Sequence, residues 1–277
     1  MRKFYNQKLK ILRNFQIQNP ELELKLIISN SIKRKNYYLI NELNIKDINR
    51  EKFNNFFKRR IKGEPISKIL KNKEFWSLDF YTNKYVLDPR PETEHIVEGV
   101  LKYYLNKEEK LSFCDFGTGS GCIIISLLKY YSRSKGIGID ISPRAIEVAK
   151  KNSIKHHTTK RLKLYNKDWK NMNKRFDVIV SNPPYIKNFD FYKLKKEVQL
   201  YDPKISLIGG SDGLKKFKEI APIVNICMKK SAIFLLEIGY RQKKSIEKIF
   251  NQNNLQLIEV IRDLQGIERV MVFKKTK

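Results

Sequence analysis

The sequence predicts an α/β fold in which a seven-stranded sheet is covered by helices and preceded by a small helical domain. Short apolar runs alternate with helical segments from Leu111 onward, which is typical of a mainly parallel sheet. The first 72 residues instead place apolar side chains at helical spacing and contain few glycines. With 277 residues, 41% of them hydrophobic, the chain is long enough for two unequal domains.

The elements fall into three segments. Residues 1–72 form the helical domain, with Phe53, Phe56 and Phe57 spaced as on one helix face. Residues 73–91 form a β-hairpin linker, because aromatic and apolar side chains alternate with period two there. Residues 92–277 form the main domain, which opens with a helix to about residue 105. We expect its strands, the last two as an antiparallel pair, at 111–116, 135–140, 161–166, 176–181, 231–238, 255–261 and 267–274.

Composition excludes several classes of protein. Three scattered cysteines without a C-x-x-C pair indicate neither a disulfide framework nor a zinc site, and they favour a reducing cytoplasm. No apolar run approaches the roughly 20 residues of a membrane-spanning helix, and the N-terminus does not resemble a signal peptide, so we expect no membrane contact. The net charge of +28 is compatible with nonspecific RNA contact. We favour a solvated lysine-rich face instead, because scattered lysines are usually solvated.

A glycine-rich loop follows the first strand of the main domain and precedes a helix. Glycines allow sharp turns and a close approach of backbone to ligand, and the helix N-terminus offers N–H groups to an anion. A dinucleotide fingerprint starting at Gly117 requires glycine at position 122, where Cys122 stands. The alternative is a flexible loop without a ligand. The candidate cofactor residues are Gly117, Thr118, Gly119, Ser120 and Gly121.

Two further candidates end the next two strands. Asp140 is expected at a strand tip, where an acid accepts hydrogen bonds from ribose hydroxyls; the alternative is that it only leads into the following helix. Asp168 and Trp169 follow the third strand and place a polar group and a ring where adenine would lie. Trp169 is equally suited to the core. Together these residues favour an adenosine cofactor.

The sharpest motif is Asn-Pro-Pro-Tyr at 182–185, directly after the strand ending at Ser181. A planar NH₂ nitrogen is a weak nucleophile because its lone pair is delocalised, so a site must orient it toward a methyl sulfonium. The Asn182 side-chain oxygen and the Pro183 carbonyl are two acceptors for its N–H groups. Pro184 fixes the backbone, and Tyr185 offers a ring to the flat group. A structural turn is the alternative. Because aspartate keeps an acceptor, Asn182→Asp is expected to retain more activity than Asn182→Ala.

With these motifs the sequence resembles the HemK/PrmC family of release-factor glutamine N5-methyltransferases over nearly its whole length. Segments outside the catalytic motifs carry much of the resemblance: Arg59-Arg60, Gly63-Glu64-Pro65-Ile66, Glu74-Phe75-Trp76, Pro89-Arg90-Pro91-Glu92-Thr93-Glu94, Leu236-Glu237-Ile238-Gly239 and Arg262-Asp263-Leu264-Gln265-Gly266-Ile267-Glu268-Arg269.

The resemblance implies a Rossmann-like catalytic domain, S-adenosylmethionine as cofactor, and methylation of the glutamine in the Gly-Gly-Gln loop of peptide-chain release factors. The helical domain would help to hold the release factor. By position, Gly117 to Gly121, Asp140, Trp169 and Asn182 would bind cofactor. The 182–185 motif would bind the glutamine amide, with Asn182, Pro183 and Tyr185 as catalytic residues.

Two other functions remain open from the sequence. A methyltransferase acting on an exocyclic amine of RNA or DNA bases would use the same planar-nitrogen clamp, and the basic charge favours it. An inactive RNA-binding module on the same fold is the second. His95, His156 and His157 lack metal-ligand spacing, so we expect no metal site.

Overall fold

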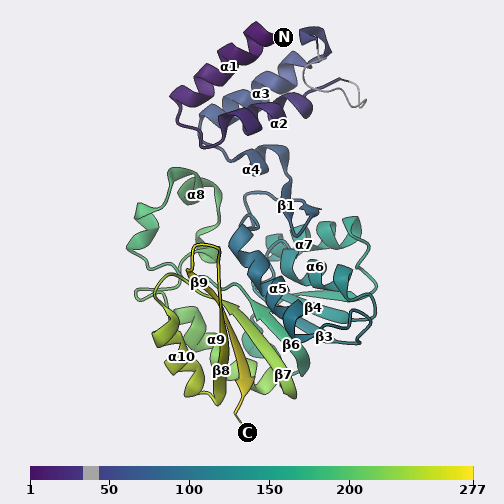
Figure 1. The fold of residues 1–277 in the computed structure, drawn as a ribbon, viewed down its shortest axis with the longest axis vertical. Helices are drawn as coiled ribbons and strands as arrows, with labels where there is room; N and C mark the ends of the chain where they lie inside the picture. The colour runs from purple at the N-terminus through teal and green to yellow at the C-terminus, as the bar shows by residue number, and fades with distance from the viewer. Residues whose placement is uncertain (34–43, 277) are drawn as a thin grey trace. The chain divides into compact units, whose positions relative to one another are not determined.

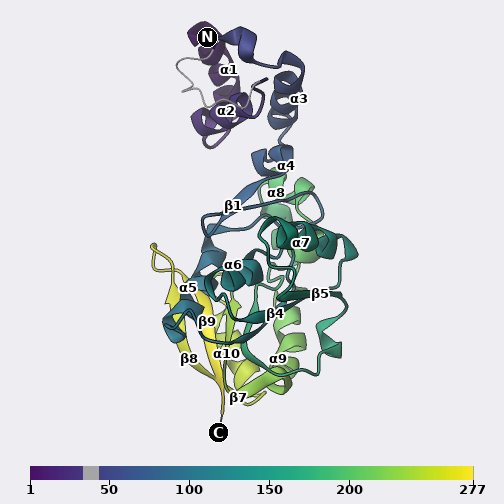
Figure 2. The same cartoon turned by 90° about the vertical axis from the view of Figure 1, so that its right-hand side faces the viewer.

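The computed structural model describes residues 1–33 and 44–276. The chain separates into two compact units, Met1–Lys71 and Asn72–Lys277. Figures 1 and 2 show the helices of the first unit and the sheet of the second. None of the helices in the described ranges is both long and apolar enough to cross a membrane.

The first unit is helical and has its own core. Within residues 1–33 and 44–71 its elements are α1 (Arg2–Asn14), α2 (Pro20–Ser29), the 3₁₀ turn η2 (Ile45–Asp47), α3 (Arg50–Ile61) and α4 (Ile66–Leu70). The buried Arg60 guanidinium pairs with Glu23 of α2, which ties α3 to α2. The core residues are Leu9, Leu12, Leu24, Ile27, Ile28, Ile48, Phe53 and Phe57.

The second unit contains the predicted seven-stranded sheet, in the order β5-β4-β3-β6-β7-β9-β8. The α/β fold class is therefore confirmed. The strands are β3 (Ser112–Phe116), β4 (Lys135–Asp140), β5 (Leu162–Asn166), β6 (Phe176–Ser181), β7 (Met228–Glu237), β8 (Leu255–Arg262) and β9 (Glu268–Lys275). The pairs from β5 through β7 are parallel, whereas β9 runs antiparallel to both β7 and β8. The last strand thus lies inside the sheet, and β8 forms its edge.

Helices cover both faces of the sheet (Figure 1). One face packs against α5 (Glu94–Tyr103) and α6 (Cys122–Tyr130), and α7 (Pro143–Lys155) adjoins β4 and β5. The other face packs against α9 (Lys215–Cys227) and α10 (Lys243–Asn251). The remaining elements of this unit are η3 (Pro91–Thr93), η4 (Trp169–Asn171), η5 (Asp190–Lys193), α8 (Lys196–Tyr201) and η6 (Lys204–Ser206).

The hairpin at the start of this unit is shorter than the alternating pattern predicts. Its strands are β1 (Lys73–Phe75) and β2 (Leu78–Phe80), joined by Trp76 and Ser77, which both have positive φ as in a type I′ turn. Pairing stops after Phe80 because the next backbone groups bond elsewhere. The Asn152 side chain of α7 accepts the Tyr81 N–H at 2.7 Å and donates to the Tyr81 carbonyl at 3.0 Å.

The strand order reverses between β3 and β6, which lie side by side at the centre of the sheet. In open parallel sheets, ligands bind at the carboxyl ends of the strands at such a reversal. The glycine loop follows β3, and Asn182 follows β6. The topology therefore brings the two sharpest sequence motifs to one place.

Candidate active site

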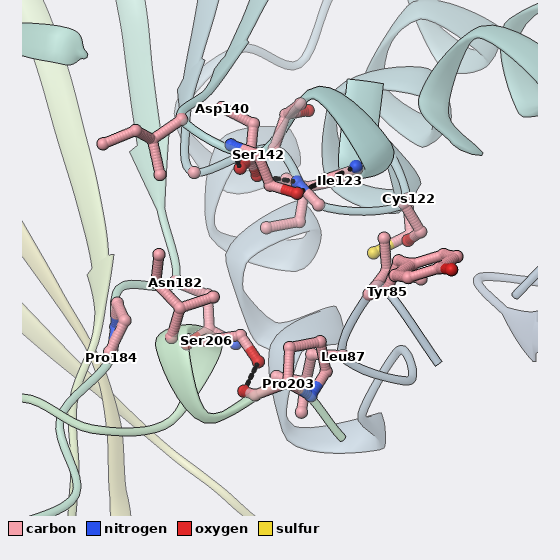
Figure 3. Close-up of a pocket in the computed structure, with 18 of the residues that line it drawn as sticks. Tyr85, Leu87, Cys122, Ile123, Asp140, Ser142, Asn182, Pro184, Pro203 and Ser206 are labelled. Carbon is pink, nitrogen blue, oxygen red and sulfur yellow. Dashed lines mark hydrogen bonds between the residues drawn. The ribbon is translucent and has the colours of Figure 1, made fainter. Parts of the chain in front are cut away.

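A cavity lies at the carboxyl ends of β3, β4, β5 and β6 (Figure 3). Further walls come from residues 85–90, from Pro203, Ile205 and Ser206, and from α9. In Figure 3, Asp140 and Ser142 lie at one end and Pro184, Pro203 and Ser206 at the other. The lining includes eight of the predicted site residues: Gly117, Thr118, Gly119, Ser120, Asp140, Trp169, Asn182 and Pro184.

The glycine loop is held against β4 and leaves room for a ligand. The N–H groups of Gly117 and Thr118 both donate to the Ile139 carbonyl at 2.9 Å. Gly117 and Gly119 have φ of 77° and 54°, values that favour glycine. A Cβ added at either residue would meet no described atom closer than 3.8 Å outside the adjoining residues. A ligand can therefore approach this backbone closely.

Three predicted residues lie outside the cavity lining: Gly121, Pro183 and Tyr185. Gly121 precedes α6 with φ of 80°, and a Cβ there would lie 2.9 Å from the Ile125 side chain and 3.4 Å from Ala149. Its role in this structure is close packing of α6 on α7. Tyr185 is half-buried, and its hydroxyl donates to Glu237 at 3.2 Å.

Asp140 ends β4 as predicted, and both carboxylate oxygens accept backbone hydrogen bonds. Oδ2 accepts from the Gly119 N–H and Oδ1 from the Ser142 N–H, each at 2.9 Å. Since a carboxylate offers about four lone-pair sites, each oxygen keeps capacity for a ligand hydroxyl. Burial raises the pKa of Asp140, while the two N–H groups oppose that rise. Asp140 thus both supports the glycine loop and faces the cavity.

Trp169 combines the two interpretations that the sequence left open. Its ring lines the cavity and also packs against the core, with Phe116 at 6.4 Å between ring centroids. Its buried Nε1–H has no hydrogen-bond partner among the described residues. Asp168 caps η4 by accepting the Lys170 N–H at 3.0 Å. Lys216 of α9 lies over the Trp169 ring, 5.5 Å from its centroid.

Three polar residues around the cavity had no role in the site predicted from the sequence: Thr93, Asp115 and Glu237. Thr93 lines the cavity, and the Thr93 hydroxyl donates to Glu237 at 2.6 Å. Asp115, on β3, accepts from the Thr118 hydroxyl at 2.7 Å, while its other oxygen has no partner among the described residues. Asp115 and Glu237 are both acids inside apolar strands, and that pattern alone was a signal. An acid in a buried strand requires partners, which are supplied by a site or a network.

Burial raises the pKa of both of these acids. Asp115, fully buried, has its pKa raised to about 7, and the Asp140 charge adds to the rise while Thr118 opposes it. Burial raises the pKa of Glu237 to about 7 as well, opposed by hydrogen bonds from Thr93 and Tyr185. These two acids change charge near neutral pH, unlike acids at the surface.

The stability of the protein should depend on pH through Asp115. The pKa of Asp115 is higher in the folded protein than in the unfolded chain. Its contribution to the free energy of unfolding is therefore fully present below the unfolded-state pKa, near 4, and is lost as pH rises through about 7. Asp115→Asn removes this titration. The unfolding free energy of the variant minus that of wild type should therefore rise by about 1 to 3 kcal/mol as pH goes from about 5 to about 8. Urea denaturation without cofactor measures the difference; a constant difference across this range would contradict the assignment.

Comparisons with known proteins agree with this geometry. A methyltransferase domain model matches residues 107–254. A release factor glutamine methyltransferase from Koribacter versatilis is 32% identical over 99% of this chain and 98% of its own length. The chain belongs to the release factor glutamine methyltransferase family. A second member of this family, from Caulobacter vibrioides, is 37% identical over 79% of this chain and 76% of its own length. The resemblance predicted from the sequence motifs is thereby confirmed.

Other proteins similar to this chain are longer than it is. A bifunctional methyltransferase from Rickettsia bellii is 35% identical over 98% of this chain but only 54% of its own length. The chain therefore spans about half the length of the bifunctional relatives it matches. Among solved structures, a methyltransferase from Pyrococcus furiosus superposes with a TM-score of 0.54 at 17% identity, covering 81% of this chain and all of that one. At that identity the likeness shows the shared fold.

The cofactor of this methyltransferase domain is S-adenosylmethionine, as predicted, and the residues present fit it. The backbone of Gly117 and Gly119, which lines the cavity, suits the methionine part. The Asp140 carboxylate suits ribose hydroxyls, and the Trp169 ring with its unpartnered N–H suits adenine. No group of three or more His, Cys, Asp or Glu side chains that could hold a metal occurs in residues 1–33 and 44–276.

Proposed function

We propose that this chain transfers the methyl group of S-adenosylmethionine to the side-chain amide nitrogen of the glutamine in the Gly-Gly-Gln motif of peptide-chain release factors. The observation that carries this proposal is Asn182, which lines the cofactor cavity directly after β6. Full-length family members named as release factor glutamine methyltransferases support the substrate.

The chemistry requires orientation more than acid–base catalysis. The bound cofactor supplies a methyl group on a positively charged sulfur, which is already activated for transfer. The Asn182 side-chain oxygen and the Pro183 carbonyl accept the two amide N–H groups and aim the nitrogen lone pair at that carbon. As the N–C bond forms and the S–C bond breaks, the nitrogen gains positive charge and then loses a proton to solvent. The uncharged thioether and the methylated glutamine are released.

Incubation with methyl-labelled S-adenosylmethionine tests this function. Purified protein is given either intact release factor, the same factor with its motif glutamine changed to alanine, or an RNA fraction. We expect label only in the intact factor, located by mass spectrometry in the Gly-Gly-Gln peptide. Label in RNA alone would favour an exocyclic base amine as acceptor, which the charge of +28 would assist. Absence of label in all three samples would favour the interpretation that the protein is an inactive binding module.

We propose that the helical unit Met1–Lys71 helps to dock the release factor. Each unit has its own core, and the residues placed in the cavity all belong to Asn72–Lys277. A protein starting at Lys73 should bind S-adenosylmethionine with unchanged affinity, measured by calorimetry. Its kcat/KM for intact release factor should fall by about tenfold or more, because each tenfold corresponds to the loss of about 1.4 kcal/mol of binding free energy. Methylation at the full rate would show that docking does not need this unit.

We also propose a reducing compartment such as the cytoplasm for this protein. Cys114, Cys122 and Cys227 are all free and buried. Burial raises the pKa of each thiol, which keeps it protonated and unreactive.

A further inference from the structure

We infer that Thr93 and Glu237 are positioning residues that hold the side-chain amide of Asn182 with its oxygen directed toward the substrate. This inference rests on the proposed function, because it assigns a role for the transfer to glutamine. It extends the site beyond the 182–185 motif to residues from two other parts of the chain.

A chain of hydrogen bonds links the three residues. Asn182 Nδ2 donates to Thr93 Oγ1 at 3.0 Å, and Thr93 Oγ1 donates to Glu237 Oε2 at 2.6 Å. The second carboxylate oxygen of Glu237 accepts from the Tyr185 hydroxyl at 3.2 Å. Two residues of the same motif are thereby linked to the Glu237 carboxylate, Asn182 through Thr93 and Tyr185 directly.

When Glu237 is ionised, the chemistry of these groups fixes the direction of every bond. An ionised carboxylate only accepts, so the Thr93 hydroxyl must use its single proton toward Glu237. Thr93 then has only lone pairs left for Asn182, and an amide offers a donor only through its NH₂ group. The Asn182 amide must therefore turn Nδ2 to Thr93. Its Oδ1, which takes no hydrogen bond from the described residues, is left for a ligand.

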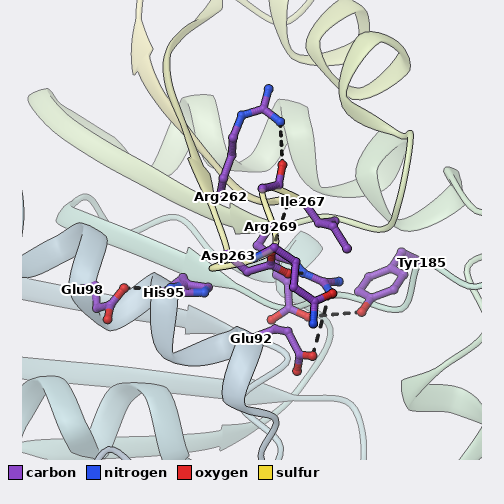
Figure 4. Close-up of polar contacts among 11 residues, drawn as sticks. Glu92, His95, Glu98, Tyr185, Arg262, Asp263, Ile267 and Arg269 are labelled. Atoms are coloured by element: carbon purple, nitrogen blue, oxygen red, sulfur yellow. Dashed lines mark hydrogen bonds and ion pairs between the residues drawn. The ribbon is translucent and has the colours of Figure 1, made fainter.

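The surroundings hold Glu237 in place. Glu237 and Thr93 are 2% and 3% exposed, so neither can exchange its partner for bulk water. The charged groups that act on Glu237 are Arg269 of β9 and Glu92 of η3. Asp263 in turn accepts from Arg269 Nε at 2.7 Å. Figure 4 shows Arg269, Asp263, Glu92 and Tyr185 gathered at this place.

The orientation matters because the wrong one reverses the recognition. If the Asn182 amide turned over, Nδ2 would face the glutamine NH₂ group, and two donors would meet. The nitrogen would lose one of its two acceptors and its aim at the methyl carbon. An unconstrained asparagine side chain adopts both orientations of its amide. Hydrogen bonding to Thr93 excludes the unproductive orientation before the substrate binds.

Substitution of Thr93 tests the inference. Thr93→Val has nearly the same shape but neither donates nor accepts, so the amide of Asn182 loses its constraint. We expect kcat for release factor methylation to fall on the order of tenfold or more, with the affinity for S-adenosylmethionine nearly unchanged. Thr93→Ser keeps the hydroxyl and should recover most of kcat. A purely structural role of the threonine would predict equal losses for serine and valine, or a common loss of cofactor affinity.

A change in substrate preference provides a second measurement that does not depend on turnover. A release factor whose motif glutamine is replaced by glutamate presents a carboxylate, which the two acceptors of the wild-type site repel. With Thr93→Val, Asn182 can turn Nδ2 toward that carboxylate. The ratio of Kd values, glutamate factor over glutamine factor, should therefore fall by about tenfold. An unchanged ratio together with wild-type kcat in Thr93→Val would overturn the inference.

The two proposals fail in different ways. If the wild-type protein does not methylate release factor, the proposed function is wrong whatever the Thr93 variants do. If wild type is active and Thr93→Val matches it in both kcat and the Kd ratio, only the positioning role is wrong.

Discussion

Asn182→Ala is expected to slow methyl transfer to the release factor glutamine by on the order of a hundredfold or more. The substitution deletes one of two acceptors that orient the amide nitrogen, and loss of one positioned polar contact in an active site has effects of this size. Cofactor affinity should be nearly unchanged, because the glycine loop, Asp140 and Trp169 remain. Single-turnover assays with mass spectrometry of the Gly-Gly-Gln peptide measure the rate.

The same segment offers a matched control for this substitution. Asn188 is exposed, six residues after Asn182, and lies outside the cavity lining. Asn188→Ala should keep the wild-type rate. A fast Asn182→Ala enzyme would mean that the 182–185 motif is only a structural turn.

The structure also alters what is expected of Asn182→Asp. From the sequence alone, aspartate retains an acceptor and should be milder than alanine. In the structure, Nδ2 is the donor that Thr93 requires, and aspartate has none. The Thr93 hydroxyl would then be shared by two carboxylates that repel one another, the one introduced at position 182 and that of Glu237. We expect Asn182→Asp to be no more active than alanine at neutral pH and to recover in part as pH falls.

Asp140→Ala is expected to weaken S-adenosylmethionine binding by about ten- to a hundredfold, as for the loss of one or two hydrogen bonds to a charged group. Two effects add. Ribose hydroxyls lose their acceptor, and the N–H groups of Gly119 and Ser142 lose the carboxylate that anchors the glycine loop. Calorimetry gives the affinity, and circular dichroism checks that the variant is folded.

Asp140→Asn separates the two effects. It keeps one acceptor oxygen, so it can still hold either Gly119 or Ser142, and its affinity should lie between alanine and wild type. Asp190→Ala is a suitable control, since Asp190 is paired with Lys193 on η5 and lies outside the cavity lining. Wild-type affinity in a folded Asp140→Ala protein would remove Asp140 from the cofactor site.

Much of this protein follows from local sequence signals. Apolar runs of five or six residues bounded by turn residues predict β3, β4, β5 and β6, and each lies within one residue of its expected bounds. The positive φ of a glycine and the fixed φ of the prolines at 183 and 184 are conformational preferences of single residues. Loops that depend on them can therefore be predicted from the sequence before the fold is known. The strand-tip position of Asp140 follows for the same reason, because it depends only on where β4 ends.

Tertiary structure alone decided the rest. Periodicity cannot tell which neighbour a strand pairs with, so the place of β9 between β7 and β8 came only from the folded sheet. The same holds for the bonds from Asn182 to Thr93, 89 residues away, and from Thr93 to Glu237, 144 residues away. Whether a side-chain amide presents its oxygen or its nitrogen depends on the partner beside it in space. The sequence therefore identifies the candidate residues of the 182–185 motif, and the packing of η3, β6 and β7 determines which atom of the Asn182 side chain faces Thr93.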